Sequence, residues 1–259
     1  MLAAFMKHRY LLSLLVIREI RIRYARAALG IAWALFMPLA MMAVFTVLNF
    51  GRLIDETSEY KALPYSVFAY CGLLFWTHFA TSLTQATPSL VVSGNLLKKC
   101  AFPRETIPLA KMISGLLDLA IGAVFLVVLM LIMDVPLRIS ALAVPLILVL
   151  QIAFTAGLVL LLSAANLFYR DVNYLVQVGV VLGMFATSVI YPVITEHPLA
   201  NLILGLNPMS SFIDAYREAL LLGRFPGPGL LMGALGSVAS LCLGVLAFKR
   251  MSPRFAEEV

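Results

Sequence analysis

The side chains that could perform catalysis are few and scattered in this sequence. Its histidines, His8, His78 and His197, fall in three different segments, so they can hardly share one metal ion. Acid–base hydrolysis needs positioned carboxylates or a histidine pair, and the acidic residues near the apolar segments occur singly. The chain also has no GxxxxGK[ST] phosphate loop and no HExxH, GxSxG or EF-hand pattern. We therefore expect no enzyme, no metal site and no ATP hydrolysis by such a loop.

One acidic residue, Asp118, falls within a long apolar segment. A carboxylate inside a membrane span costs about 2.5–3.5 kcal/mol on insertion scales, so it must face protein or water. Ser114 and Gly122 share its helix face, because residues four apart lie one above the other. The pattern favours a hydrogen-bonded tie near the cytoplasmic end of a span. A proton relay is disfavoured, since no second acid or histidine stands beside Asp118.

The amino-acid composition indicates that the protein lies in a membrane. Hydrophobic residues make up 62% of the chain and charged residues 12%, against roughly 25% charged in soluble domains. Six apolar segments reach the ~20 residues that a membrane-spanning helix needs, and no strand-like alternation appears. We therefore expect an all-α integral membrane protein with six transmembrane helices. The six segments are Leu29–Phe50, Tyr65 to about Val92, Leu109–Met133, Ile139–Phe168, Tyr174–Ile194 and Leu230–Phe248.

Basic residues are concentrated on alternate connections, fourteen on one side and five on the other. Basic loops stay in the cytoplasm, so both termini are expected there. The net charge of +6 then points to anionic membrane lipids rather than to nucleic acid. Three regions follow: a cytoplasmic interface helix over 1–28, a six-span domain over 29–248 and a cytoplasmic tail over 249–259.

The N-terminal region, Phe5–Ala27, is too charged to span and is expected to lie as an amphipathic helix at the cytoplasmic interface. Tyr10, Leu14, Ile17 and Arg21 share one face. Arg18, Arg23 and Arg26 lie on other faces, and we expect their charges to stay in water while their stems are buried.

Two other features concern packing within the membrane. The second segment is polar in its later half, which indicates either hydrogen bonding between helices or the lining of a wet cavity. These polar residues are His78, Thr81, Ser82, Thr84, Gln85 and Thr87. Small residues repeat every four positions at Gly236, Ser240 and Gly244, and again at Gly179 and Gly183, which predicts close helix contacts.

After Tyr191-Pro192 the chain makes a long excursion on the outer side. Asn207 is a candidate N-cap, Pro208 a first helical residue and Gly223 a helix stop. Between them Ser210–Leu222 is amphipathic, with Asp214, Arg217 and Glu218 expected on polar faces. The segment is too short to cross, so half-inserted or surface helices are expected.

The segment Ser93–Pro108 is the longest internal cytoplasmic connection. Two prolines and mixed charge predict a short helix followed by a rigid turn. Exposed apolar residues ringed by charge favour a docking site, although a solvated basic loop that serves topology alone remains an alternative.

Several short motifs together resemble the polysaccharide-exporting ABC-2-type permeases, the membrane subunits of ABC transporters for O-antigen, teichoic acid and capsular polymers. The similarity covers nearly the whole chain, in the same order, and is closer to the O-antigen exporters than to the capsule branch. The matching pieces are Arg18-Glu19, Arg23-Tyr24, Leu29-Gly30, Trp33, Pro38, Leu97-Lys98-Lys99, Phe102-Pro103-Arg104-Glu105, Pro108-Leu109-Ala110, Tyr169-Arg170-Asp171-Val172, Tyr191-Pro192 and Asn207-Pro208-Met209.

The resemblance implies a homodimer in a bacterial inner membrane, working with two separate ATPase subunits that hold ATP and Mg²⁺. It implies that the loop after the second span docks into the ATPase, with a second inner turn at Arg170 and Asp171. The implied coupling residues are Asn95, Leu96, Leu97, Lys98, Lys99, Phe102, Pro103, Arg104 and Glu105; those of the interface helix are Arg18, Glu19, Arg21, Arg23 and Tyr24. Re-entrant outer helices would fall in Pro198–Leu222.

The implied substrate is a long glycan on a polyprenyl diphosphate lipid, and aromatic side chains commonly stack on sugar faces. The candidates to line its path are Trp33, Phe36, Tyr70, Phe75, Trp76 and Phe79. Each of them can equally be a lipid-facing anchor or a packing residue. The rival functions are an ABC-2 exporter of a drug or lipid, an ion-coupled secondary transporter and a structural scaffold. The secondary transporter is disfavoured because neither inverted repeats nor paired intramembrane charges are visible.

Overall fold

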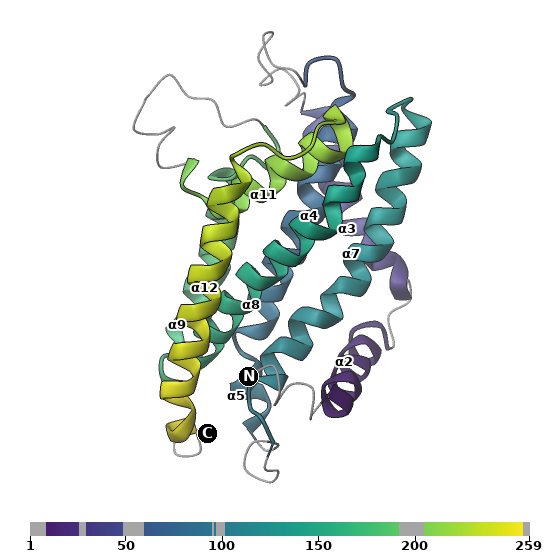
Figure 1. Ribbon diagram of the computed structural model, residues 1–259. Coiled ribbons are helices and arrows are strands. Elements are labelled where there is room, and N and C mark those ends of the chain that lie inside the picture. Colours follow the sequence, from purple (N-terminus) through teal and green to yellow (C-terminus); the bar gives the residue numbers. More distant parts are fainter. Residues whose placement is uncertain are drawn as a thin grey trace.

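The computed structural model describes residues 9–25, 30–48, 60–94, 96, 102–191 and 205–255. Within these ranges all regular structure is helical, and the helices form a bundle (Figure 1). The elements are α2 (Arg9–Tyr24), η1 (Gly30–Ala32), α3 (Trp33–Val47), α4 (Tyr65–Ala86), α5 (Ser89–Val92), α7 (Thr106–Ile132), η3 (Ile139–Ala143), α8 (Val144–Phe168), α9 (Asp171–Phe185), α11 (Pro208–Arg217), η4 (Glu218–Leu222, a π-helical turn), α12 (Leu230–Met251) and η5 (Ser252–Arg254).

Three helical segments are long and apolar enough to cross a membrane, namely Thr106–Ile132, Ile139–Phe168 and Leu230–Arg254. The apolar helices α3 and α9 are shorter. In Figure 1 the C-terminus and α5 lie at one end of the bundle, whereas α11 lies across the opposite end. The all-helical membrane fold expected from the sequence is therefore confirmed in its coarse form.

Two expected spans end earlier than their apolar runs. The second was expected to continue to about Val92, but α4 ends at Ala86, and Pro88 separates it from α5. Proline lacks an N–H group and clashes with the preceding turn, which explains this break. The fifth was expected over Tyr174–Ile194, but α9 ends at Phe185 and residues 186–190 form turns. The cause of that second break is tertiary and is described below.

Helix α4 forms the centre of the bundle. Fifteen of its 22 residues are buried, and it packs against α3, α7, α8, α9 and α11. Because protein rather than lipid surrounds α4, it tolerates the polar residues that set it apart in the sequence. Its threonine hydroxyls bond to the preceding turn, with Thr81 Oγ1 donating to Thr77 O (2.7 Å) and Thr87 Oγ1 to Leu83 O (2.7 Å).

The α8–α12 contact depends on small residues, as the repeat at Gly236, Ser240 and Gly244 predicted. A Cβ at Gly244 would lie 2.0 Å from Gly157 O, and Ser240 Oγ donates to Phe154 O (2.8 Å). The second predicted small-residue contact is wrong in part. A Cβ at Gly179 would meet no atom of the described residues within 4 Å, while one at Gly183 would meet Trp76 at 3.1 Å.

The local signals around α11 are confirmed. Asn207 Oδ1 accepts from Met209 N (3.0 Å), Pro208 occupies the first turn, and Gly223 takes a left-handed conformation with φ of +70°. The polar-face prediction for Arg217 is wrong, because this side chain is fully buried. Residues 192–204, which include Pro192 and the beginning of the expected re-entrant stretch, lie outside the described residues.

Candidate functional site

The interface helix α2 packs along α7 through residues four apart, which share one helix face. On this face Leu15 is buried and Glu19 pairs with Lys111 Nζ of α7. Tyr10, which the sequence places on one face with Leu14, Ile17 and Arg21, is 75% exposed. The side of α2 that packs on α7 is therefore the one with Leu15 and Glu19.

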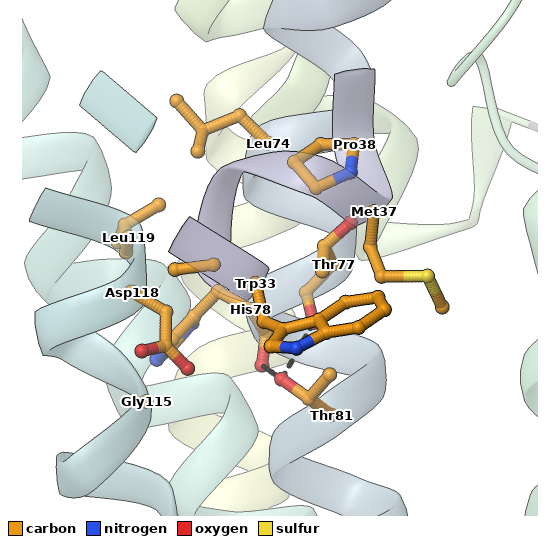
Figure 2. Close-up of a pocket in the computed structure, with 11 residues that line it drawn as sticks. Trp33, Met37, Pro38, Leu74, Thr77, His78, Thr81, Gly115, Asp118 and Leu119 are labelled. Carbon is orange, nitrogen blue, oxygen red and sulfur yellow. Dashed lines mark hydrogen bonds between the residues drawn. The ribbon is translucent and has the colours of Figure 1, made fainter. Parts of the chain in front are cut away.

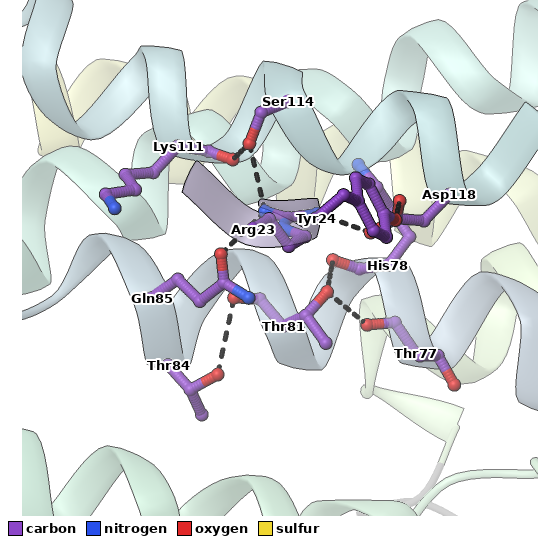
Figure 3. Close-up of polar contacts among 10 residues, drawn as sticks. All are labelled: Arg23, Tyr24, Thr77, His78, Thr81, Thr84, Gln85, Lys111, Ser114 and Asp118. Carbon is purple, nitrogen blue, oxygen red and sulfur yellow. Dashed lines mark hydrogen bonds and ion pairs between the residues drawn. The ribbon is translucent and has the colours of Figure 1, made fainter. Parts of the chain in front are cut away.

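Arg23 continues this bundle-facing row and joins three helices (Figure 3). Its Nη1 pairs with the Asp118 carboxylate of α7, and its Nη2 donates to Gln85 Oε1 of α4 (2.6 Å) and to Ser114 Oγ of α7 (2.9 Å). Tyr24 OH donates to the other oxygen of Asp118. The expectation that Arg23 keeps its charge in water is wrong, because three side-chain acceptors from α4 and α7 bind a guanidinium that is only 19% exposed.

This network accounts for the acidic residue in the third span. The side chains of Arg23 and Asp118 are only 19% and 27% exposed, so each charge needs the other. Burial, and then the bond to Asp118, raise the pKa of Tyr24 to about 12. The phenol therefore stays protonated at physiological pH and keeps donating to Asp118.

A small cavity adjoins the network, between α3, α4 and α7 (Figure 2). Its volume is about 110 Å³, which is room for several water molecules. Its lining residues are Trp33, Ala34, Met37, Pro38, Leu74, Thr77, His78, Thr81, Gly115, Asp118 and Leu119. Of the polar residues expected in the second span, Gln85 binds another helix, while His78 and Thr81 line this cavity.

Among the described residues, the six aromatic candidates are divided between separate cavities and the packed core. Trp33 borders the small cavity. Phe36 is half exposed and packs edge-on against the Trp33 ring, with 5.1 Å between the ring centroids. Tyr70 is a packing residue, since it is fully buried and its hydroxyl donates to Gly122 O (3.3 Å). Phe75 stacks on Tyr216 at 3.4 Å between ring centroids.

Trp76 and Phe79 line a second cavity of about 260 Å³, which we call the aromatic groove. Phe154 of α8 completes its aromatic wall, and α9 supplies Gly179 and Gly183 opposite. Val176 and Val180 of α9 also line it, and Trp76 and Phe79 are themselves almost fully buried, so the groove is a narrow space between α4, α8 and α9. This groove is the place where a planar sugar face or an apolar chain could lie against aromatic rings.

The expected coupling segment is described only in part. Asn95 and residues 97–101 lie outside the described residues, and with them Leu97, Lys98 and Lys99. Leu96 and Phe102 are half-buried and pack against the core of this chain. Pro103 O accepts from Thr106 Oγ1 (2.7 Å), so the turn from Phe102 to Glu105 leads directly into α7.

Arg104 is held by the C-terminal segment of this chain. Its Nη1 donates to Ser252 O, and its guanidinium carbon lies 5.9 Å from the centroid of the Phe255 ring. Phe255 is fully buried and also contacts Phe168 (6.1 Å) and Phe248 (5.2 Å). The C-terminal segment thus joins the first inner loop to the end of α8.

The turn between α8 and α9, which was expected to be a second docking point, is exposed. Tyr169, Arg170 and Asp171 are exposed, in contrast to Phe168 beside them. The described residues contain no group of three or more histidine, cysteine or acidic side chains that could hold a metal ion. The candidate features of these segments are therefore an exposed turn at residues 169–171, a loop held by the C-terminal segment and the ion-pair network of α2.

Comparison with known proteins identifies the family. The family profile of the ABC-2 type transporters matches residues 10–221. This chain belongs to the ABC-2 type transporter family. Its membership makes it a membrane subunit of a transporter, and residues Arg23, Asp118 and Arg217 of this ABC-2 chain all fall inside the matched range.

Three relatives align with this ABC-2 chain over nearly its whole length. An O-antigen export system permease protein RfbA from Klebsiella pneumoniae is 28% identical over 252 residues, which cover 96% of this chain and 95% of the relative. RfbA from Myxococcus xanthus is 28% identical over 256 residues, covering 98% and 96%. A second Klebsiella pneumoniae RfbA is 27% identical over 252 residues, covering 96% and 95%.

Proposed function

We propose that this chain is the transmembrane subunit of an ATP-driven exporter that moves a lipid-linked polysaccharide of the O-antigen type across the bacterial cytoplasmic membrane. The observation that carries the proposal is the full-length alignment with three permeases named for O-antigen export. The alignment covers at least 95% of this chain and of each relative.

The proposal includes a six-span topology with both termini in the cytoplasm. In it α3, α4 and α9 cross together with the three long apolar segments, and α11 with η4 is half-inserted from the outer side. Two features support this arrangement: the bias of basic residues towards one set of connections, and the position of α11 at the end of the bundle opposite the C-terminus (Figure 1).

Energy is proposed to arrive from two separate ATPase subunits, which hold ATP and Mg²⁺ and bind a homodimer of this chain. The exposed turn at Arg170 and Asp171 and the segment 95–105 are the proposed docking points. A push on residues 102–105 acts directly on α7, which begins at Thr106. From α7 the Asp118–Arg23 pair carries the motion to α2, and Arg23 also carries it to α4 through Gln85.

The proposed polymer path runs beside the aromatic groove of each chain. Trp76, Phe79 and Phe154 line this groove, and the glycines of α9 keep side chains out of the space beside these rings. Aromatic faces hold sugar rings without fixing one hydrogen-bonding pattern, which suits a repetitive chain that must slide.

The proposal is tested by reconstitution. The tagged chain is purified with the ATPase that accompanies it, placed in vesicles and supplied with a lipid-linked glycan and ATP. We expect the ATPase in equal amount and glycan transport that depends on ATP. Transport by this chain in vesicles that lack any ATPase would contradict the energy source, and ATP-driven transport of a drug but no glycan would contradict the substrate.

A further inference from the structure

The fifth helix ends inside the protein. Helix α9 has 15 residues and is about 22 Å long at 1.5 Å per residue, which is shorter than the ~30 Å hydrocarbon core. The chain then turns, yet Thr187, Ser188, Val189 and Ile190 are all almost completely buried. A buried helix end leaves carbonyl groups without partners, and such groups are tolerated at membrane depth only where the protein itself supplies donors.

Side chains from α4 and from the α11 region supply these donors. Arg217 Nη1 donates to Ser188 O, and its Nη2 donates to Val189 O (2.6 Å). Tyr65 OH donates to Ile190 O (3.0 Å). Asn207 Nδ2, at the start of α11, lies 3.2 Å from Ala186 O and completes the set. Four carbonyls that follow α9 are thus capped from outside the helix.

The guanidinium of Arg217 is surrounded by an acidic side chain, an aromatic ring and a glycine. Asp214 Oδ1 lies 3.7 Å from Arg217 Nη1 and accepts from Ser188 Oγ (2.8 Å). The ring of Phe68 lies 3.6 Å from the guanidinium carbon, a cation–π distance. A Cβ at position 72 would lie 2.6 Å from Arg217 Nη2 and 2.3 Å from Val189 O, so Gly72 makes the room that the cap requires.

The capped end also fixes a wall of the aromatic groove. Gly183 lies on the last turn of α9 against the Trp76 ring, and Thr187 and Asn207 border the same groove. Any shift of the outer end of α9 therefore changes the distance between the α9 glycines and the rings of α4. Helix α11, which lies across this end of the bundle (Figure 1), supplies Arg217 to the turn that follows α9.

We propose that Arg217 is a positioning residue that caps the broken end of α9 and thereby sets the width of the aromatic groove. The function of this position in transport rests on the proposed export activity, whereas the cap itself does not. Arg217 touches backbone carbonyls and acts on the groove only through α9.

The test uses the complete complex with its ATPase and compares Arg217→Met with Arg217→Lys. Methionine keeps the apolar stem and removes every donor, whereas lysine keeps the charge on a single nitrogen and loses the planar fork with which Arg217 reaches two carbonyls. Arg250→Met on the exposed end of α12 is the matched control. Hydrogen exchange of residues 186–191 reports the cap, and glycan exported per ATP hydrolysed reports the groove.

We expect exchange at 186–191 to accelerate about tenfold or more in Arg217→Met, less in Arg217→Lys, and not at all in Arg250→Met. Export per ATP should fall in the same order while the complex stays assembled. If Arg217→Met does not assemble, Arg217→Lys decides the question. Wild-type exchange at 186–191 in the lysine variant overturns the cap, and faster exchange with unchanged export per ATP overturns the role in the groove. A wild-type complex that exports no glycan contradicts the proposed function and leaves the exchange measurement valid for the cap.

Discussion

Arg23 and Asp118, which are 95 positions apart in the sequence, form an ion pair that fastens the interface helix α2 to α7. Gln85 and Ser114 occupy the remaining donors on the second guanidinium nitrogen. The pair therefore makes α2 part of the bundle, so that a movement of α2 or of α7 acts on the other.

The first prediction concerns the strength of this pair. Because both side chains are less than a third exposed, replacing Asp118 by Asn leaves a poorly compensated charge on Arg23 and should cost about 1–3 kcal/mol of unfolding free energy. The reversed pair Arg23→Asp with Asp118→Arg should recover part of that loss. Unfolding in detergent measures both. A reversed pair that is no better than the sum of its single variants would contradict a direct interaction.

The second prediction concerns pH. The pKa of Tyr24 is raised to about 12 in the folded chain, from about 10 in an unfolded one. The contribution of the protonated phenol to stability is thus complete below pH 10 and is lost as the pH rises through 12. Emission of Trp33, which lines the same cavity as Asp118, should stay constant from about pH 6 to 10 and change as the pH rises through about 12.

The control for this titration is Tyr24→Phe, in a Trp76→Phe background that leaves Trp33 as the single tryptophan. This variant keeps the ring and lacks the titrating hydroxyl, so the alkaline change in Trp33 emission should shrink. An identical alkaline change in both proteins would assign the signal to other groups.

Local rules predicted much of this fold because their causes are local. The cap at Asn207 and the stop at Gly223 depend on residues within one turn, and both were predicted correctly. Apolar length likewise identified α7, α8 and α12, since length against bilayer thickness is a property of each segment alone.

The same local rules failed to predict the positions of two charged residues. Arg23 and Arg217 were both expected on wet faces because a single helix offers no acceptor for them. Their acceptors stand 95 and 28–29 positions away, and no pattern within one helix shows such partners. The early end of α9 has the same origin, since its apolar run continues while Arg217 and Tyr65 bind the carbonyls that follow it.

The third prediction concerns the inner loop. Arg104→Glu should lower glycan export per ATP hydrolysed and leave insertion intact, because the loop loses its hold on Ser252 and on the Phe255 ring. Phe255→Ala should act in the same direction. Truncating a buried Phe costs about 3–5 kcal/mol in protein cores, enough to release a short terminal segment.

Arg250→Glu, an exposed charge change on the neighbouring helix end, is the control for this loop and should have little effect. Export and ATP hydrolysis are measured on the same purified complexes. Normal export per ATP in Arg104→Glu would refute a coupling role for the loop, and an effect of Arg104→Glu without one of Phe255→Ala would refute the brace.

The fourth prediction compares two glycines, one expected to matter for helix packing and one for the proposed glycan path. Gly244→Leu drives a side chain into Gly157 of α8, where even a Cβ would lie 2.0 Å from the carbonyl oxygen, and should destabilise the chain by at least about 1–3 kcal/mol. Gly179→Leu meets no described atom at its Cβ and exchanges a poor helix former for a good one, worth up to about 1 kcal/mol of added stability. Because Gly179 borders the aromatic groove, the same change should nevertheless block glycan export. Thermal unfolding and export are therefore expected to move in opposite directions for Gly179→Leu and together for Gly244→Leu. A Gly179→Leu variant that exports at the wild-type rate would remove the aromatic groove from the path.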